Sequence, residues 1–510
     1  MPSQPMLLEM PEDVAPRKPA PAPRAPRLKE PNRKQLIIDN IDLDQLIPAG
    51  HLARGIWAVV QCLPTEGFLK ENKSVEGHAG RPRMSPKMLL AIWVYGYSQG
   101  IGQARELAEE MKYEPALRWL AGNIMVNFRT LSEFRVAHGE ALKETFAELL
   151  GLFAEQGLVD LTELTLDGTK IKANASSDTR RREKTLQEHI AKAAEAVKNL
   201  EQAEAATEIS NRQRAARKRA AEELHERLQL GVRELEEIRK GKTAKEQEEA
   251  RVSLTDPEAR LMKDGQGAFG LNYNVQVLTE TKNKVVVDVA ITQEGNDQRQ
   301  LAPAMERLSE NEQLPKTIII DGGYRTAAAI EAADENGVDL IGPPLDTATQ
   351  QVRNCAQSLK QAGIATEFGP SAFIQIEEGA ALQCPAGKRL GLKQTSRDFQ
   401  QYVSNKSDCA GCPHQPQCSP KGQRWVKVKL DNEAVKAYDK RMREAENQER
   451  YKKRGPVAEF PHAWWKDKCG LRQFHVRGKV KVEIEAWWVA LTYNIQQWIR
   501  LSGAPKLAVA

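Results

Sequence analysis

The sequence of 510 residues contains no apolar run that approaches the roughly 18 residues needed to span a membrane. Its N-terminus also lacks the apolar core of a secretory signal. Both absences argue against a membrane protein and favour a cytoplasmic one. A chain of this length is expected to form roughly two to four domains, with enough buried volume for a mixed sheet.

The sequence also lacks a strong overall charge, because its net charge at pH 7 is only +5. That value alone does not indicate a nucleic-acid-binding protein. However, the segment 421–481 contains 18 Lys and Arg residues against 8 Asp and Glu residues, so the rest of the chain is slightly acidic. A basic segment of this kind can hold a phosphate backbone, although a solvated helix face has the same composition.

Cysteine is scarce, and four of the seven residues cluster in one segment, Cys384, Cys409, Cys412 and Cys418. A CxxC pair with two further thiols nearby is typical of a four-cysteine Zn2+ site. In a chain without an export signal, a metal is favoured over disulfides. Such a site would be structural, because four ligands leave no open position for water. Free thiols, or His414 in place of one ligand, are the alternatives.

Three carboxylates that lie far apart in the sequence carry the strongest functional signal. Asp167 ends the run LTELTL and Asp321 ends the run TIII, and each is followed by Gly, so each is predicted at the carboxyl end of a strand. Glu459 lies within the basic segment. Three acidic groups would repel one another unless a cation neutralised them, and oxygen ligands of this kind favour Mg2+. Together they indicate phosphodiester cleavage, although a single Asp-Gly after a strand is typical of an ordinary turn.

Candidate phosphate-binding cations accompany these carboxylates. Lys170 and Lys172 follow Asp167 within the same segment. Lys466 follows Glu459 by seven residues, which is two helical turns and places both side chains on one helix face. Asp167 and Glu459 are therefore each accompanied in the sequence by lysines that could bind a phosphate.

Runs of β-type sequence alternate with helical patterns in the order β-β-β-α-β-α-β-α, and LNYNVQVLTE and NKVVVDVAITQ are predicted as a β-hairpin. Asp297, after the third run, is a rival for the second carboxylate position. Asp321 is preferred because it ends a buried strand beside a Gly-Gly turn, whereas Asp297 is predicted to cap the helix that follows.

The N-terminal part contains a helix-turn-helix pattern. A helix is predicted over 85–97 with Ser85 as its N-cap, and a second helix follows a glycine turn. Gln103 and Arg105 would stand at the start of this second helix, where base edges are read in proteins of this type. An ordinary hairpin within a helical bundle is the alternative.

The segments LTLDGTKIKANAS, GLNYNVQ and TIIIDGGYRT, followed by a Tyr-Arg-Glu-Lys set, resemble the catalytic domain of DDE transposases of bacterial insertion sequences. The set consists of Tyr451, Arg454, Glu459 and Lys466. The interval between the Arg and the Glu is one residue longer than is usual in that family. His462 and the alanine after it stand where relatives often have Phe-Gly.

This resemblance implies an α/β protein with an RNase H-like mixed sheet. It implies that Asp167, Asp321 and Glu459 hold two Mg2+ ions, or Mn2+, for in-line phosphoryl transfer. Lys466 and Arg454 would steady a phosphate and Tyr451 would contact the strand near it. The partners would be double-stranded DNA, both terminal inverted repeats and target, and a second copy of the chain in a synaptic homodimer at the bacterial nucleoid.

The predicted organisation combines this resemblance with composition. Residues 1–34 hold nine of the 27 prolines, and 180–243 is rich in Ala, Glu, Lys, Arg and Leu. From the N-terminus we predict a disordered basic Pro-rich tail (1–34), an all-helical DNA-binding region (35–150), the first part of the RNase H-like core (151–179), a helical hairpin insertion (180–250), the second part of the core (251–345), a Cys-rich zinc-binding insertion (346–425) and a basic helical segment with the third carboxylate and a core helix (426–505).

In the last segment, a helix over 482–501 carries tryptophans on one broad apolar face, which favours packing on the sheet over base stacking. Two other functions stay open at this point. One is a DNA-binding protein that kept the transposase scaffold without activity. The other is a metal-dependent nuclease that cuts DNA without strand transfer.

Overall fold

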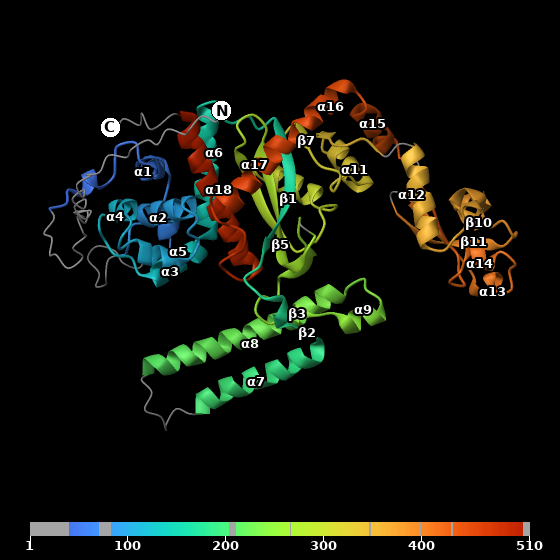
Figure 1. Cartoon of the computed structure of the whole chain (residues 1–510), viewed down its shortest axis with the longest axis horizontal. Coiled ribbons are helices and arrows are strands. Elements are labelled where there is room, and N and C mark those ends of the chain that lie inside the picture. Colours follow the sequence, from blue (N-terminus) through green and yellow to red (C-terminus); the bar gives the residue numbers. More distant parts are fainter. Residues whose placement is uncertain are drawn as a thin grey trace, which may run out of the picture. The chain divides into compact units, whose positions relative to one another are not determined.

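The computed structural model describes residues 40–70, 83–202, 211–265, 267–345, 348–396, 399–429 and 432–502 (Figure 1). The predicted tail over 1–34 lies outside these residues. Residues 1–42 form a separate unit from 43–510, and every contact reported below lies within the second unit. That unit is a mixed α/β structure with two sheets of five or more strands. None of its described helices is long and apolar enough to cross a membrane.

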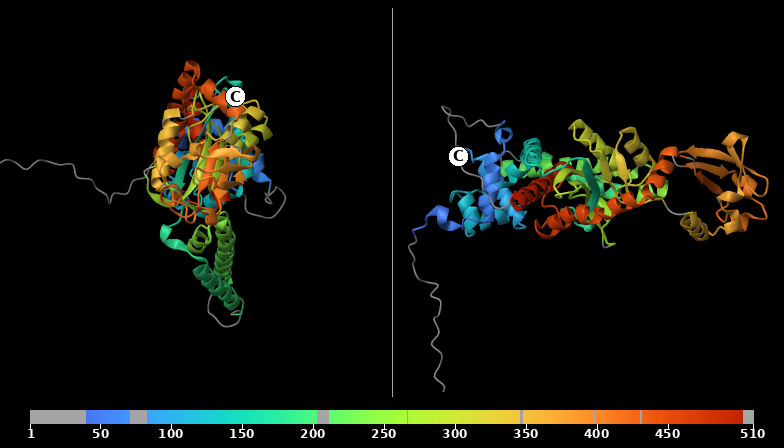
Figure 2. Two further views of the ribbon diagram at one scale, coloured as in Figure 1. Left: turned by 90° about the vertical axis from the view of Figure 1, so that its right-hand side faces the viewer. Right: turned by 90° about the horizontal axis from the view of Figure 1, so that it is seen from above.

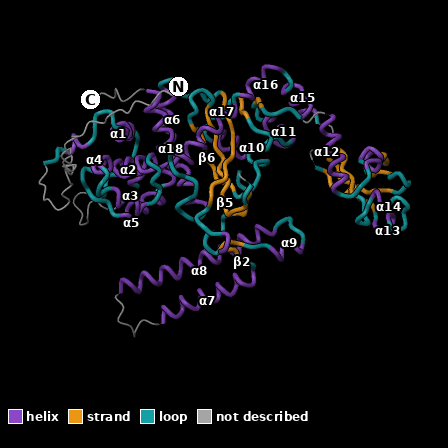
Figure 3. Tube along the Cα trace, viewed as in Figure 1, coloured by secondary structure: helices purple, strands orange, loops and turns teal. Residues whose placement is uncertain are grey.

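The first part of the unit is helical throughout (Figure 3). Its helices are α1 (Leu52–Cys62), α2 (Pro86–Ser98), α3 (Ala104–Glu110), α4 (Pro115–Leu120), α5 (Phe128–Ala137) and α6 (Gly139–Glu155). The Ser85 side chain accepts a hydrogen bond from the Met88 N–H at 3.5 Å, and Pro86 occupies the first turn of α2, where a missing N–H costs nothing. The predicted helix and its cap are therefore confirmed.

The C-terminal helix α18 (Lys479–Ser502) packs between these helices and the main sheet, against α2, α6 and strand β6. Its Trp487, Trp488 and Trp498 are buried, and the Trp488 indole N–H donates to the carbonyl of Arg135 at 2.9 Å. The prediction that these tryptophans belong to the core is confirmed.

A buried polar cluster joins α18 to the helical part. The Glu485 carboxylate is fully buried and accepts hydrogen bonds from the backbone N–H groups of His475 at 2.9 Å and Val476 at 3.3 Å. The His475 ring lies 2.7 Å from it, the Tyr97 hydroxyl donates to it at 3.3 Å, and the Arg135 guanidinium lies 3.6 Å away. This one carboxylate thus ties together α2, α5, α18 and the loop before α18.

The main sheet has the order β4-β5-β1-β7-β8, and β6 also pairs with β5. Its strands are β1 (Glu163–Lys172), β4 (Arg260–Lys263), β5 (Phe269–Glu280), β6 (Val286–Thr292), β7 (Thr317–Ile319) and β8 (Asp339–Ile341). Strand β1 is antiparallel to β5 and parallel to β7, and β7 is parallel to β8. Helices α10 (Leu301–Glu310) and α11 (Ala327–Glu335) make the crossovers, as the alternation predicted, whereas β4 was not anticipated.

Asp167 does not end its strand, so that part of the prediction is wrong. Strand β1 continues to Lys172 because β5 is long enough to pair with all of it, down to Asn272. Only the ladder with β7 stops early, at the pair of Thr165 and Ile319. On that edge, the next pairing within the described residues is the bridge between Lys172 and Gln473. Asp167 lies in the interval between these two pairings.

The segment after β1 forms an insertion with its own small core (Figures 1 and 2). Strand β2 (Arg180–Arg181) pairs with β3 (Val252–Ser253), so its two ends meet. Between them, α7 (Glu183–Gln202) and α8 (Asn211–Arg239) lie side by side, and α9 (Ala244–Glu249) follows. Helices α7 and α8 thus form a hairpin within the described residues.

A second sheet, of order β13-β12-β11-β10-β9, follows α12 (Ala348–Gln361). Its strands and short helices are β9 (Ile374–Ile376), β10 (Ala381–Gln383), β11 (Arg389–Thr395), β12 (Phe399–Ser404), α13 (Lys406–Cys409), α14 (Gln415–Cys418) and β13 (Trp425–Lys429). This antiparallel sheet was not anticipated. After it come α15 (Glu433–Met442), α16 (Ala445–Lys452) and α17 (Arg454–Asp467).

Two glycines offer a matched test of this packing. Gly102 is buried, and a Cβ there would overlap the ring of His475, so Gly102→Ala is expected to lower the free energy of unfolding by about 1–3 kcal/mol. Gly151 lies exposed within α6 with nothing within 4 Å of an added Cβ, so Gly151→Ala is expected to raise it by about 0.5–1 kcal/mol. Urea unfolding of both variants checks the two signs. Equal stability of the two variants would contradict the contact with His475.

Candidate catalytic site

Two of the three predicted carboxylates meet at one guanidinium group. The Arg454 Nη2 atom lies 2.8 Å from Asp167 Oδ1 and 3.8 Å from Asp321 Oδ2. Asp167 comes from the middle of β1, Asp321 follows β7, and Arg454 begins α17. The pairing of β1 with β7 explains why residues so distant in sequence come together, because its register matches Thr165 with Ile319 and each aspartate lies two residues beyond that pair.

Helix α17 places the other predicted residues beside β1. The Lys466 ammonium donates to the Thr169 hydroxyl at 2.6 Å, and Thr169 lies on the same face of β1 as Asp167, two residues away. Glu459 is exposed on α17, on the same helical face as Lys466 because seven residues make two turns. The helix therefore directs Lys466 at the strand that carries Asp167, whereas the placement of Glu459 beside the two aspartates stays a prediction.

His462 is a buried addition to this group. Its Nδ1 lies 3.6 Å from Asp167 Oδ2, and within the described residues its Nε2 has no hydrogen-bond partner. Burial, together with the nearby Lys466 and Arg454 cations, lowers the pKa of His462 from 6.5 to about 3. The ring is therefore neutral at neutral pH.

Burial also dominates the electrostatics of Asp167, whose side chain is only 15% exposed. Burial raises the pKa of Asp167 from 3.8 to about 6; Arg454 opposes this rise, and the Asp321 and Asp297 carboxylates add to it. Burial likewise lowers the pKa of Lys466, although Asp167 opposes this change. A partly buried acid with two other carboxylates nearby is the environment in which a bound cation is stabilising.

Asp297 is not the helix cap that the sequence predicted. Gln300 occupies the N-cap of α10, and the Asp297 carboxylate instead accepts hydrogen bonds from Asn274 at 2.7 Å and Gln276 at 2.8 Å. It also pairs with Lys170 at 3.3 Å. Asp297 therefore stays a rival second carboxylate, held in place by β5, and Lys170 is engaged by it and not directed at solvent.

The remaining predicted DNA-contact residues lie apart from these groups or at their margin. Gln103 occupies the N-cap position of α3 and is exposed, and Arg105, two residues later, is also exposed, with its guanidinium 4.9 Å from the centre of the Phe128 ring. Lys172 is exposed at the end of β1. Tyr451, at the end of α16, packs partly buried against the main core.

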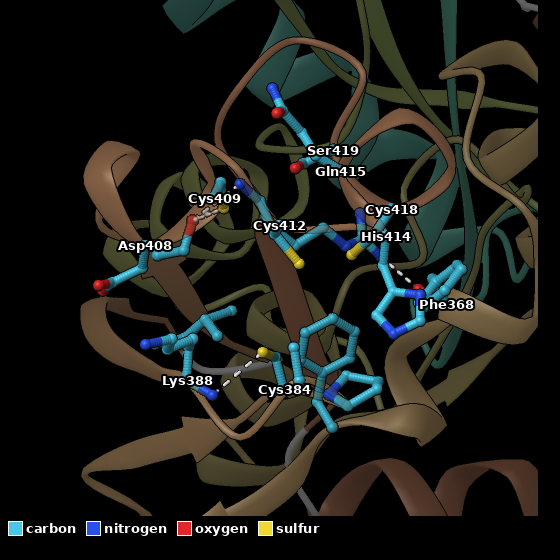
Figure 4. Close-up of a pocket in the computed structure, with 16 residues that line it drawn as sticks. Phe368, Cys384, Lys388, Asp408, Cys409, Cys412, His414, Gln415, Cys418 and Ser419 are labelled. Carbon is cyan, nitrogen blue, oxygen red and sulfur yellow. Dashed lines mark hydrogen bonds between the residues drawn. The ribbon is translucent and has the colours of Figure 1, made fainter.

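The four clustered cysteines line a single cavity of about 30 Å3 in the second sheet (Figure 4). The Cys384 sulfur accepts a hydrogen bond from the Lys388 N–H at 3.3 Å, and the Cys409 sulfur lies 3.1 Å from the Ser404 hydroxyl. Burial raises the pKa of Cys418; the other three thiols add to this and Arg424 opposes it.

No metal-binding group is formed as the side chains stand. Among the residues that the structure describes, no three His, Cys, Asp or Glu side chains are arranged to hold an ion. The carboxylate oxygens of Asp167 and Asp321 nevertheless fit a divalent cation. Both lie near one point of positive charge, which in this structure is the Arg454 guanidinium. The predicted magnesium and zinc sites both stay predictions.

Comparison with known proteins gives two family matches. Residues 383–499 match a family model described as "Transposase DDE domain", and residues 41–137 match one described as "Transposase domain (DUF772)". These matches support a DDE transposase of the insertion-sequence type. No curated protein matches it. The DDE match includes Glu459 and Lys466, whereas Asp167 and Asp321 lie before it.

One similar solved structure is the cryo-EM structure of a piggyBac transposase synaptic complex with hairpin DNA. The two chains share 10% identity, and the alignment covers 91% of this transposase and 77% of that chain at a TM-score of 0.26. A score this low supports no conclusion about the present fold.

Sequence reasoning missed several residues that build the transposase site. Arg450 ties α16 to the sheet, through Glu163 at 2.6 Å, Thr317 at 3.1 Å and Asp339 at 3.3 Å. The side-chain amides of Asn274 and Gln276, which hold Asp297, were also missed. Both residues lie in β5, whose sequence shows only the ordinary alternation of apolar and polar residues. One feature of the sequence pointed to His462, because this residue stands where relatives often have Phe-Gly.

Proposed function

We propose that this transposase binds the terminal inverted repeats of an insertion sequence and catalyses Mg2+-dependent DNA cleavage and strand transfer by in-line phosphoryl transfer. The observation that carries the proposal is the meeting of Asp167, Asp321 and Arg454, with Lys466 against the same strand. Acidic and basic side chains at one point suit a reaction in which a phosphate must be held while negative charge develops on it.

An RNase H-like core is supported by the strand order. Strands β6, β5 and β1 are antiparallel neighbours, and β7 and β8 extend the sheet in parallel with β1. The first carboxylate then lies on the central strand and the second follows the adjacent parallel one. Helix α17 covers the interval of β1 that no strand occupies on that edge within the described chain.

Asp167, Asp321 and Glu459 are the residues that would hold two Mg2+ ions, or Mn2+. When bound, such ions supply an activated water or DNA 3′-hydroxyl and stabilise the leaving oxygen. Glu459 is exposed on α17, two helical turns before Lys466.

The cations of the chain have separable roles. Lys466 and Arg454 would contact the scissile or the adjacent phosphate, and Tyr451 the strand near it. The Arg454 guanidinium carries several N–H donors. On DNA binding, donors that now face the two carboxylates would turn to the phosphate. Lys170 is engaged by Asp297, so its role is to position that carboxylate, and the exposed Lys172 is the freer candidate for a phosphate contact.

The reaction proceeds by two displacements at phosphorus without a protein-bound intermediate. In the first, a water oxygen forms the new bond to phosphorus and the departing oxygen leaves as the 3′-hydroxyl of the element's end. In the second, that 3′-hydroxyl attacks a target phosphate and displaces the target's own 3′-oxygen. Both steps would take place in a DNA-bound homodimer at the nucleoid, with Gln103 and Arg105 of the helical part reading the terminal repeat.

The second candidate function is an inactive DNA-binding protein derived from a transposase. It is favoured by one finding, that the described side chains form no ready three-ligand group. A nuclease without strand transfer is a third outcome. All three are separated by the products formed.

The test is incubation of the full chain with labelled DNA of its flanking repeats, a target plasmid and Mg2+. We expect cuts that leave 3′-hydroxyls at the repeat ends and joined products in the plasmid. Cuts without joining would indicate the nuclease, and repeat binding without cuts the inactive protein.

The same assay decides between the rival second carboxylates. Asp321→Asn is expected to remove cleavage and joining together. Asp297→Asn is expected to lower the rate about 10- to 100-fold, as for a group that orients others through hydrogen bonds. If Asp321→Asn cleaves normally while Asp297→Asn is inert, the assignment is reversed.

A further inference from the structure

The second sheet has a very small apolar core. Within the described residues, one cluster of buried apolar side chains forms this core, namely Phe373, Leu382, Leu390, Tyr402 and Val426. Cys384 and Cys418 pack against this cluster. A core of this size rarely stabilises a fold by itself, and small units of this kind commonly depend on disulfides or a structural metal. No disulfide joins the cysteines, which are all free thiols.

The four cysteines that line the cavity come from three short segments that backbone hydrogen bonds hold in place. Cys384 begins the turn from β10 to β11, where its backbone N–H donates to the carbonyl of Lys388 and its sulfur accepts from the Lys388 N–H. Cys409 and Cys412 bracket a second turn, closed by a hydrogen bond of 3.1 Å from the Cys412 N–H to the Cys409 carbonyl. Cys418 ends α14.

These turns present sulfur atoms to one small space. Figure 4 shows the sulfurs of Cys384, Cys412 and Cys418 pointing into the cavity, with Cys409 at its edge. Its volume of about 30 Å3 exceeds the roughly 10–15 Å3 that one water needs on the same measure, so it has room for an ion. The backbone N–H that Lys388 directs at sulfur stabilises a thiolate there.

We propose that Cys384, Cys409, Cys412 and Cys418 bind one Zn2+ ion that joins the β10–β11 turn to the segment of α13 and α14. As the side chains stand, the sulfurs are not gathered at ligand distance, so binding draws the turns together. Each thiol gives up its proton on binding, and four thiolates around Zn2+ leave two net negative charges.

Two cations of the chain balance that charge. The Arg424 side chain is buried beside Cys418, where it donates to the Phe368 carbonyl at 2.7 Å. Lys388 lines the same cavity. His414, in contrast, places its ring against Phe368 with the ring centres 5.3 Å apart, so it supports the wall of the site and is not a ligand.

The zinc content of the purified full chain tests this proposal independently of any DNA reaction. After growth with zinc and dialysis under reducing conditions, we expect about one Zn2+ per chain in the wild type, in His414→Ala and in Cys62→Ser, and close to none in Cys412→Ser. Cys62 is an exposed cysteine of α1 and serves as the matched control. Replacement of the zinc by Co2+ is expected to give the intense sulfur-to-metal absorption of a four-thiolate site.

A second measurement covers the case that Cys412→Ser fails to fold. A strong chelator added to the wild type is expected to release the ion and to speed hydrogen exchange in β10, β11 and β12 while leaving that of β1 and β5 unchanged. Wild-type protein without zinc, zinc retained in Cys412→Ser, or zinc lost in His414→Ala would each overturn the four-cysteine assignment. So would disulfides among these cysteines under reducing conditions.

Discussion

Asp167→Asn is expected to lower strand cleavage on the order of 10³-fold or more and, at the same time, to make the folded protein more stable at neutral pH. The loss of activity follows because the variant removes one of the carboxylates proposed to hold the cations, which contribute several kcal/mol to the transition state. The gain in stability follows from burial, which disfavours the charged form of this side chain.

The pH dependence of this gain has a defined sign. The pKa of Asp167 rises from 3.8 in the unfolded chain to about 6 in the folded protein, so the unfolded chain loses this proton first. The wild-type free energy of unfolding therefore falls between these two values and is lower by about 3 kcal/mol above them. The asparagine variant escapes this penalty. Its advantage is expected to be absent below pH 3.8 and complete above pH 6.

Urea unfolding of wild type and Asp167→Asn across this pH range measures the difference. Added Mg2+ is expected to raise the melting temperature of the wild type only. Asp334→Asn, at an exposed position of α11, is the control and is expected to change neither activity nor stability by more than about 0.5 kcal/mol. Normal cleavage by Asp167→Asn would exclude this residue from the reaction, and unchanged stability would contradict the effect of burial.

Glu485→Ala is expected to lower the free energy of unfolding by about 3–5 kcal/mol. The variant leaves the buried Arg135 without its counter-charge and strips two backbone N–H groups, of His475 and Val476, of their acceptor. Burial alone would raise the pKa of Glu485, but the His475 ring and Arg135 outweigh it and the pKa is lowered. The stabilisation is therefore complete above about pH 4.5 and lost as the pH falls through the lowered value.

Glu483→Ala provides the matched control on the same helix. Glu483 pairs with Lys143 at 3.0 Å, but the two side chains are 29% and 39% exposed, so the loss is expected to stay below about 1 kcal/mol. Thermal and urea unfolding of both variants give the comparison. Equal free energies of unfolding of the two variants would show that the Glu485 cluster does not stabilise the fold.

The sequence predicted those features that depend on local pattern. Ser85 and the apolar spacing after it defined α2, and the broad apolar face of tryptophans identified α18 as a core helix. Two alternating runs gave the hairpin of β5 and β6. The meeting of Asp167 with Asp321 could also be anticipated, because each comes just after an apolar run that a parallel sheet would place beside the other.

Other features depend on partners that the sequence does not mark. Asp167 lies mid-strand because β5 is long enough to pair with all of β1, which no property of Asp167 reveals. Asp297 was assigned to a helix cap from its local context, whereas amides of β5 and Lys170 determine its position. The second sheet was missed because its strands are short and largely polar, with a core of few side chains.

The insertion after β1 closes on itself, since β2 and β3 pair at its two ends and its helices share an apolar cluster of their own. A gain or loss of whole helical turns in α7 and α8 would lengthen or shorten this helical arm without moving its paired ends, β2 and β3. The register of β1 on β5 would then be preserved, and with it the place of Asp167. Related elements could in this way vary an entire arm during evolution while keeping the chemistry of strand exchange.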